Sequence, residues 1–145
     1  MSGEFGDAER ERLASALDRD GVAAAYVFGS QARGEAGPLS DVDVAVWAAP
    51  GMLPRDRFEL RMRLTSAATR ALAGERVDLV VLDDASPLLR QRAWRDGRLL
   101  IDRDPVTRVR DEARALVEFL DTKPLREQMA AGVRNRIAEG RFGRR

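Results

Sequence analysis

The stretch FGSQARGEAGPLSDVDVAVW, residues 28–47, determines which fold this chain can adopt. It begins at the end of a continuous apolar run, VAAAYVF, which is short enough to be a buried β-strand. Gly29 and Ser30 then end that strand sharply. A second strand begins at Asp41, where acidic and apolar residues alternate. Because successive side chains of a strand point to opposite faces, we expect Asp41 and Asp43 to project together from one face.

The rest of the chain alternates between helical and strand patterns. Apolar residues at helical spacing predict three helices, over 7–17, 55–72 and 87–96. Short apolar or alternating runs predict two further strands, over 76–83 and 98–101. This order predicts an α/β (α+β) domain with a small mixed β-sheet flanked by helices. It leaves open whether the first two strands pair antiparallel or are joined by a tight crossover.

The C-terminal part of the chain predicts helix only. An apolar stripe at helical spacing is formed by Val109, Ala113, Leu116, Val117 and Leu120. Pro124 is expected to end or kink this helix, since proline removes a hydrogen bond from a helix interior. A second helix is expected to follow, with one narrow apolar edge at Leu125, Met129, Val133 and Ile137. We expect residues 1–104 to form the core and residues 105–145 to be a helical extension of the same domain.

The composition restricts the chemistry that the chain can perform. Its 145 residues are 44% hydrophobic and 34% charged, which indicates an ordinary globular domain. The chain has no cysteine and no histidine, which excludes disulfides, zinc sites of the Cys/His type, thiol nucleophiles and histidine general bases. Carboxylates, hydroxyls, arginines and backbone groups remain. If a metal binds, hard oxygen ligands favour Mg²⁺ or Mn²⁺.

Charge and hydropathy patterning bear on location and partners. No apolar run approaches the roughly 18 to 20 residues that span a bilayer, and the polar N-terminus does not resemble a signal peptide. We therefore expect a cytoplasmic protein without membrane association. The formal net charge is only +1, but residues 123–145 are strongly basic. Such a tail is typical of a segment that contacts nucleic acid or an acidic partner, and it is equally typical of a solvated helix end.

Two halves of the opening stretch carry the chemistry. Asp41 and Asp43, one residue apart on a strand, can hold a divalent cation between them. Gly29 allows a phosphate to approach the backbone, and the Ser30 hydroxyl can donate to phosphate oxygens. Taken separately, each half is also what an ordinary strand end or turn contains.

The combination resembles the signature of the DNA polymerase β-like nucleotidyltransferase superfamily: Gly29-Ser30, ten intervening residues, and Asp41-x-Asp43 leading into a strand. The residues between, at 32–34 and 40–41, are similar to those of the minimal nucleotidyltransferases, the MNT group. The resemblance implies a polymerase β-like nucleotidyltransferase fold and a phosphate-binding role for Gly29 and Ser30. It also allows Arg33 to contact a phosphate, although a structural ion pair is the alternative for this residue.

The family resemblance further implies a third metal-binding carboxylate on a later strand. Asp78, early in RVDLVVLD, fits best, and Asp83 and Asp84 at the far end of that strand compete with it. By the resemblance, Asp41 and Asp43 bind two Mg²⁺ ions, with Mn²⁺ as an alternative. Asp78 then completes the second metal site and orients or deprotonates the acceptor hydroxyl, so that all three are catalytic residues.

The implied reaction is in-line attack of an acceptor hydroxyl on the α-phosphate of a nucleoside triphosphate, with ATP the usual donor. Small members of the group resemble the MNT antitoxins encoded beside HEPN-domain toxins, which are RNases. Those antitoxins attach AMP to a tyrosine of the toxin. The resemblance therefore implies a HEPN toxin as partner, in a hetero-oligomer or a homo-oligomer, and no nucleic acid as direct substrate. An aminoglycoside-type nucleotidyltransferase and a non-catalytic antitoxin that acts by binding alone remain as alternatives.

Overall fold

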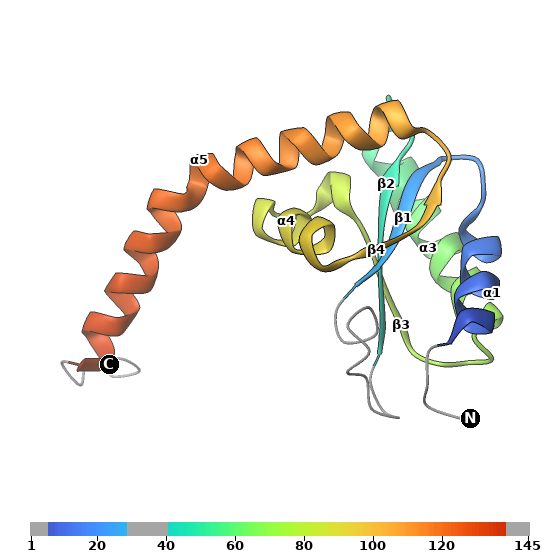
Figure 1. Cartoon of the computed structure of the whole chain (residues 1–145), viewed down its shortest axis with the longest axis horizontal. Helices are drawn as coiled ribbons and strands as arrows, with labels where there is room; N and C mark the ends of the chain where they lie inside the picture. Colours follow the sequence, from blue (N-terminus) through green and yellow to red (C-terminus); the bar gives the residue numbers. More distant parts are fainter. Residues whose placement is uncertain (1–5, 29–40, 139–145) are drawn as a thin grey trace.

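The computed structural model describes residues 6–28 and 41–138 (Figure 1). Their elements follow the predicted order: α1 (Asp7–Leu17), β1 (Val22–Phe28), β2 (Val42–Ala48), α3 (Pro54–Ala71), β3 (Val77–Val81), a 3₁₀ turn η1 (Leu82–Asp84), α4 (Pro87–Asp96), β4 (Arg98–Asp102) and α5 (Pro105–Ala138). Among these residues the strands form a mixed four-stranded sheet in the order β3-β2-β1-β4. β1 is antiparallel to β2 and β4, and β2 is parallel to β3. The predicted mixed α/β class is confirmed, and β1 and β2 are antiparallel neighbours.

The sheet buries both of its faces, each against a different pair of helices (Figure 1). α1 and α3 cover one face, where Val42, Val44 and Val46 of β2 meet the buried leucines of both helices. α4 and α5 cover the other face, where Ala45 and Trp47 pack. Trp47 is only 4% exposed and is part of this core. Since the pleat of β2 alternates strictly, its acidic residue at position 43 belongs to the α4/α5 face.

Two local features define the two ends of α4. Ser86 caps its N-terminus, where the hydroxyl accepts a hydrogen bond from the Leu89 amide at 3.2 Å. At its other end, a Cβ on Gly97 would lie 2.1 Å from the carbonyl oxygen of Ala93 and 3.2 Å from the Cβ of Tyr26. Glycine is therefore required where the chain leaves α4 for β4.

The C-terminal helix is one element and not two. α5 runs through Pro124 from residue 105 to residue 138, so the predicted division into two helices is wrong. Figure 1 shows that the helix changes direction about midway along its length. The Arg126 guanidinium donates to the carbonyl oxygen of Phe119 at 2.7 Å and lies 3.7 Å from the centre of the Phe119 ring. Pro124 leaves the carbonyl oxygen of Leu120 without its helical amide donor, and Arg126 binds the neighbouring carbonyl of Phe119.

The apolar stripe of α5 lies on its exposed side. The buried residues of the helix are Thr107, Asp111 and Ala115, which face the sheet and α4. The stripe residues Val109 and Leu120, in contrast, are 55% and 54% exposed. None of the helices in the described ranges is long and apolar enough to cross a membrane.

Candidate active site

Two of the predicted carboxylates lie side by side on the sheet. The parallel register of β2 and β3 pairs Asp43 with Asp78. Neighbouring strands are about 4.8 Å apart, and residues opposite each other in a parallel pair share a face. Both carboxylates therefore project from the α4/α5 side at the ends of the strands where β2 and β3 begin. Helix α3 and its connections separate these strands in sequence, so only the long-range pairing creates this juxtaposition.

Asp41 lies at the same end of the sheet, directly before β2. The backbone amide of Val42 donates to the carbonyl oxygen of Arg76 at 2.9 Å, which ties the residues before β2 to those before β3. The Arg76 guanidinium also pairs with the Asp41 carboxylate, with 3.4 Å between Nε and Oδ1. The sequence pattern did not indicate this arginine, because nothing local distinguishes it from the other arginines of the chain.

Asp41 and Asp78 are close enough to Asp43 for their charges to affect its protonation. The pKa of Asp43 is raised above its ordinary value, first by burial and then by the negative charges of Asp78 and Asp41. Arg92 of α4 opposes this effect through its positive charge, and it is a second basic neighbour that the sequence analysis missed. A divalent cation beside these oxygens would relieve the same repulsion.

The donor set suits a hard cation, since it consists of carboxylate oxygens without sulfur or imidazole. Within the described ranges no three acidic side chains already form a ready-made metal site. The backbone register nevertheless places Asp43 and Asp78 as neighbours, and Asp41 is held beside them by a solvent-exposed ion pair. Asp41 can therefore turn toward a cation at little cost, because an exposed pair of this kind contributes about 0 to 1 kcal/mol.

The two competing acids lie at the other end of β3 and have structural partners. The Asp83 carboxylate accepts a hydrogen bond from the backbone amide of Ala48 at 2.9 Å. Asp84 accepts from the Arg57 guanidinium, at 2.8 Å for its shortest contact, and this hydrogen bond holds the pKa of Asp84 below its ordinary value. The geometry thus favours Asp78 as the carboxylate that accompanies Asp43.

The predicted phosphate-binding residues Gly29, Ser30 and Arg33 lie outside the described residues. The described part of β1 ends at Phe28, which is paired with Asp43 across the β1–β2 register. The described part of β1 therefore ends beside Asp43.

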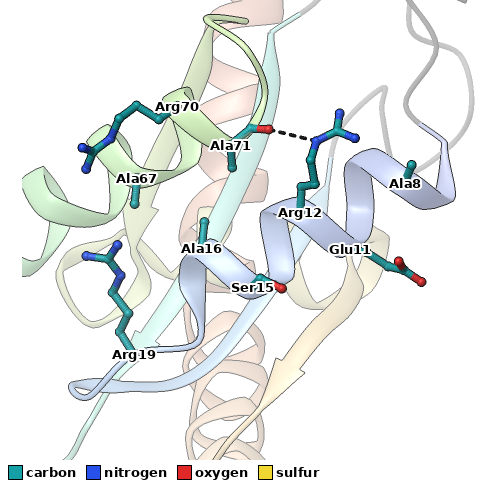
Figure 2. A pocket seen from close by; sticks show the side chains of 9 residues that line it. All are labelled: Ala8, Glu11, Arg12, Ser15, Ala16, Arg19, Ala67, Arg70 and Ala71. Carbon is teal, nitrogen blue, oxygen red and sulfur yellow. Dashed lines mark hydrogen bonds between the residues drawn. The ribbon is translucent and has the colours of Figure 1, made fainter.

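A groove lies between α1 and α3, on the side of the sheet opposite to the carboxylates (Figure 2). Alanines of both helices form much of its lining, and Arg12, Arg19 and Arg70 extend around it. Arg12 donates to the carbonyl oxygen of Ala71 at 3.0 Å and so links the two helices. The groove is on the face turned away from Asp43, and we assign the candidate site to the carboxylates.

The family model described as polymerase beta nucleotidyltransferase matches residues 11–106. The chain belongs to the polymerase β nucleotidyltransferase family. The matched range of this nucleotidyltransferase contains the whole sheet and the three carboxylates, and it ends as α5 begins. None of the curated proteins matches the chain.

Solved toxin–antitoxin complexes contain chains with the same fold as this nucleotidyltransferase. A chain of a toxin–antitoxin crystallised with AMP-PNP is 25% identical, with a TM-score of 0.67 over 86% of this chain and 97% of that one. A mutant MntA-HpeT complex contains a chain that is 25% identical, with a TM-score of 0.63 over 90% and 98% of the two chains. A complex of tri-AMPylated HEPN toxin with MNT antitoxin from Shewanella oneidensis matches at 24% identity and a TM-score of 0.62, over 86% and 95%. The last similarity shows the fold alone.

Proposed function

We propose that this nucleotidyltransferase is a Mg²⁺-dependent protein adenylyltransferase, an antitoxin that transfers AMP from ATP to a tyrosine of a cognate HEPN-type toxin and so neutralises it. The observation that carries the proposal is the register pairing of Asp43 with Asp78, with Asp41 at the same end of the sheet. The similar chain in a complex with AMP-PNP supports an adenine nucleotide as donor. The tri-AMPylated HEPN toxin bound to an MNT antitoxin suggests the acceptor.

Each carboxylate has a separate role in this proposal. Asp41 and Asp43 hold Mg²⁺, or Mn²⁺ in its place, and Asp78 completes a second metal site beside them. When bound, the ions neutralise the triphosphate and stabilise the charge on the attacking and leaving oxygens. Gly29 and Ser30 contact the phosphates, and residues 105–145 extend the catalytic core formed by residues 1–104.

The transfer itself requires positioning more than covalent chemistry by the protein. The tyrosine hydroxyl oxygen forms a bond to the α-phosphorus of ATP. The bond from that phosphorus to the oxygen bridging to the β-phosphate breaks, and pyrophosphate leaves with the electron pair. Asp78 orients the hydroxyl and accepts its proton, which then passes to solvent.

A labelling experiment tests the proposal directly. The chain is incubated with Mg²⁺, a HEPN-domain protein as the candidate acceptor, and ATP labelled either in the α- or in the γ-phosphate. Label from the α-position alone should appear on a tyrosine of the HEPN protein. Asp43→Asn should abolish it, whereas Asp83→Asn should not, since asparagine keeps the oxygen that accepts the backbone hydrogen bond at that position.

Other outcomes would point to the alternatives. Label on an aminoglycoside in place of the protein would indicate a small-molecule nucleotidyltransferase. Neutralisation of the toxin by the unreactive Asp43→Asn variant would indicate an antitoxin that acts by contact alone.

A further inference from the structure

The outward side of α5 carries an apolar stripe that the described part of the chain leaves uncovered. Its residues follow each other at alternating intervals of three and four: Val106, Val109, Ala113, Leu116 and Leu120, which we call the α5 stripe. Its four large members are 77%, 55%, 37% and 54% exposed in that order, and the adjacent Val117 is 56% exposed. Intervals of three and four are the spacing with which one helix packs along another.

The α5 stripe lies on the side of the helix opposite to the residues that hold α5 in place. Thr107, Asp111 and Ala115, at intervals of four, are the residues of α5 that are buried. The helix thus turns small and polar side chains toward its own domain and its large apolar ones away from it. This distribution is the reverse of what a helix needs when it packs only on its own sheet.

The second half of α5 has still less support from its own domain. Beyond Ala115 no described residue of the helix is buried, and Figure 1 shows this half extending past α4 and away from the sheet. In proteins most of the stability of a helix comes from packing of its apolar side, and the described part of this half has little such packing. Leu125 and Met129, which are 57% and 63% exposed, fall by helical spacing on the other side of α5, in line with Thr107 and Asp111, and are not part of the α5 stripe.

The charges beside the α5 stripe indicate which kind of partner fits. Arg110 and Arg114 follow one of its edges, and both are exposed. The contact of Arg110 with Asp111 is long, at 3.7 Å, so its guanidinium remains available. A second copy of the chain packed antiparallel, with residues 106–120 of both copies aligned, would bring the arginines of both copies together. A helix with acidic residues beside its own apolar stripe would pair with them.

We propose that the α5 stripe is the docking surface for an amphipathic helix of the toxin, with apolar residues at intervals of three and four and aspartate or glutamate beside them. The identity of the partner rests on the proposed function. Docking on α5 holds the toxin on the helix that leads away from the matched catalytic region, and so leaves the carboxylate end of the sheet open to the acceptor tyrosine.

The test is a binding titration with the same purified HEPN-domain protein as in the labelling experiment. The double variant Leu116→Glu/Leu120→Glu should bind that protein at least 100-fold more weakly and bind AMP-PNP with unchanged affinity. The matched control is Phe58→Glu/Met62→Glu on α3, whose side chains are 60% and 56% exposed and lie away from the stripe. The control should bind the HEPN protein like the wild type, and thermal melts should show that both variants are folded.

Reversing the charge of the two arginines beside the stripe provides a second test. Arg110→Glu/Arg114→Glu should weaken binding about tenfold and reduce its dependence on salt, because screened ion pairs are lost. Unchanged binding of the stripe variant to the HEPN protein would overturn the inference. The inference would also be overturned if the wild type is a dimer, the stripe variant is a monomer, and this variant still binds the HEPN protein. The stripe would then be an interface between copies of the chain.

The two proposals fail separately. If the HEPN protein binds through the stripe but never receives AMP, the proposed function is wrong and the docking surface stands. If the stripe variant labels the HEPN protein at the wild-type rate and affinity, the docking surface is wrong and the proposed function stands.

Discussion

Replacing Asp43 by asparagine should make the protein more stable and inactive. Asp43 is half-buried and in register with Asp78, so its charge is unfavourable where no cation is bound. Two unit charges about 5 Å apart repel by about 1 kcal/mol in water and by several times more when shielded from it. Because Asp78 is exposed, we expect a gain near the lower figure, about 1 kcal/mol. This corresponds to an increase in Tm of about 3 °C for a chain of this size.

The pH dependence of this gain follows from the raised pKa of Asp43. Between the ordinary carboxyl pKa and the raised value, the folded state binds more protons than the unfolded state. The stability of the wild type therefore falls as pH rises through this window. Asparagine does not titrate, so the advantage of Asp43→Asn should be complete at neutral pH and absent near about pH 3.

Thermal and urea denaturation followed by circular dichroism, with and without Mg²⁺, measure both effects. Mg²⁺ should stabilise the wild type, because a ligand that binds only the folded state raises its stability, and it should have little effect on the variant. A variant that is less stable than the wild type at neutral pH would refute the reasoning. An advantage that persists undiminished in acid would show that charge repulsion is not its cause.

Asp78→Asn, with Asp83→Asn as its control, tests a catalytic role, and Leu64→Ala and Gly97→Ala test structural roles. Asp78→Asn should reduce AMP transfer at least 100-fold in the labelling assay, whereas Asp83→Asn should leave it within a few-fold of wild type; equal losses would show that the register pairing is not decisive. Leu64→Ala should lower the free energy of unfolding by about 3 kcal/mol, since the side chain is fully buried, and a urea titration measures this. Gly97→Ala should also lower the melting temperature, because its Cβ would lie 2.1 Å from the carbonyl oxygen of Ala93, and an unchanged melt would mean that the backbone there adjusts freely.

The sequence predicted the elements well wherever a local pattern defines them. The alternation in DVDVAVW places Val44 and Ala45 on opposite faces of β2, and the two cores of the structure contain them separately. The pairing of Asp43 with Asp78 could not be derived in this way. It depends on β2 and β3 lying side by side and parallel, with an intervening helix, and no local spacing encodes that arrangement. The family resemblance suggested Asp78 where periodicity alone did not.

The C-terminal helix shows a second limit of local patterns. Periodicity identifies an apolar side of a helix but not whether the chain itself or a partner covers it. The stripe through Leu116 points outward, and the side that packs inward is held partly by polar residues such as Asp111. Likewise, Arg76 and Arg92 act on the carboxylates only because distant elements meet, so the sequence gives no signal for either.

If this chain neutralises a toxin by covalent transfer of AMP, the toxin must gain the mass of the transferred group. The most direct measurement is the intact mass of the HEPN-domain protein after incubation with the chain, ATP and Mg²⁺, followed by peptide mapping. We expect a mass increase of one or more AMP groups on tyrosine with the wild type, and none with Asp41→Ala/Asp43→Ala. A toxin that is fully neutralised at unchanged mass would contradict the account.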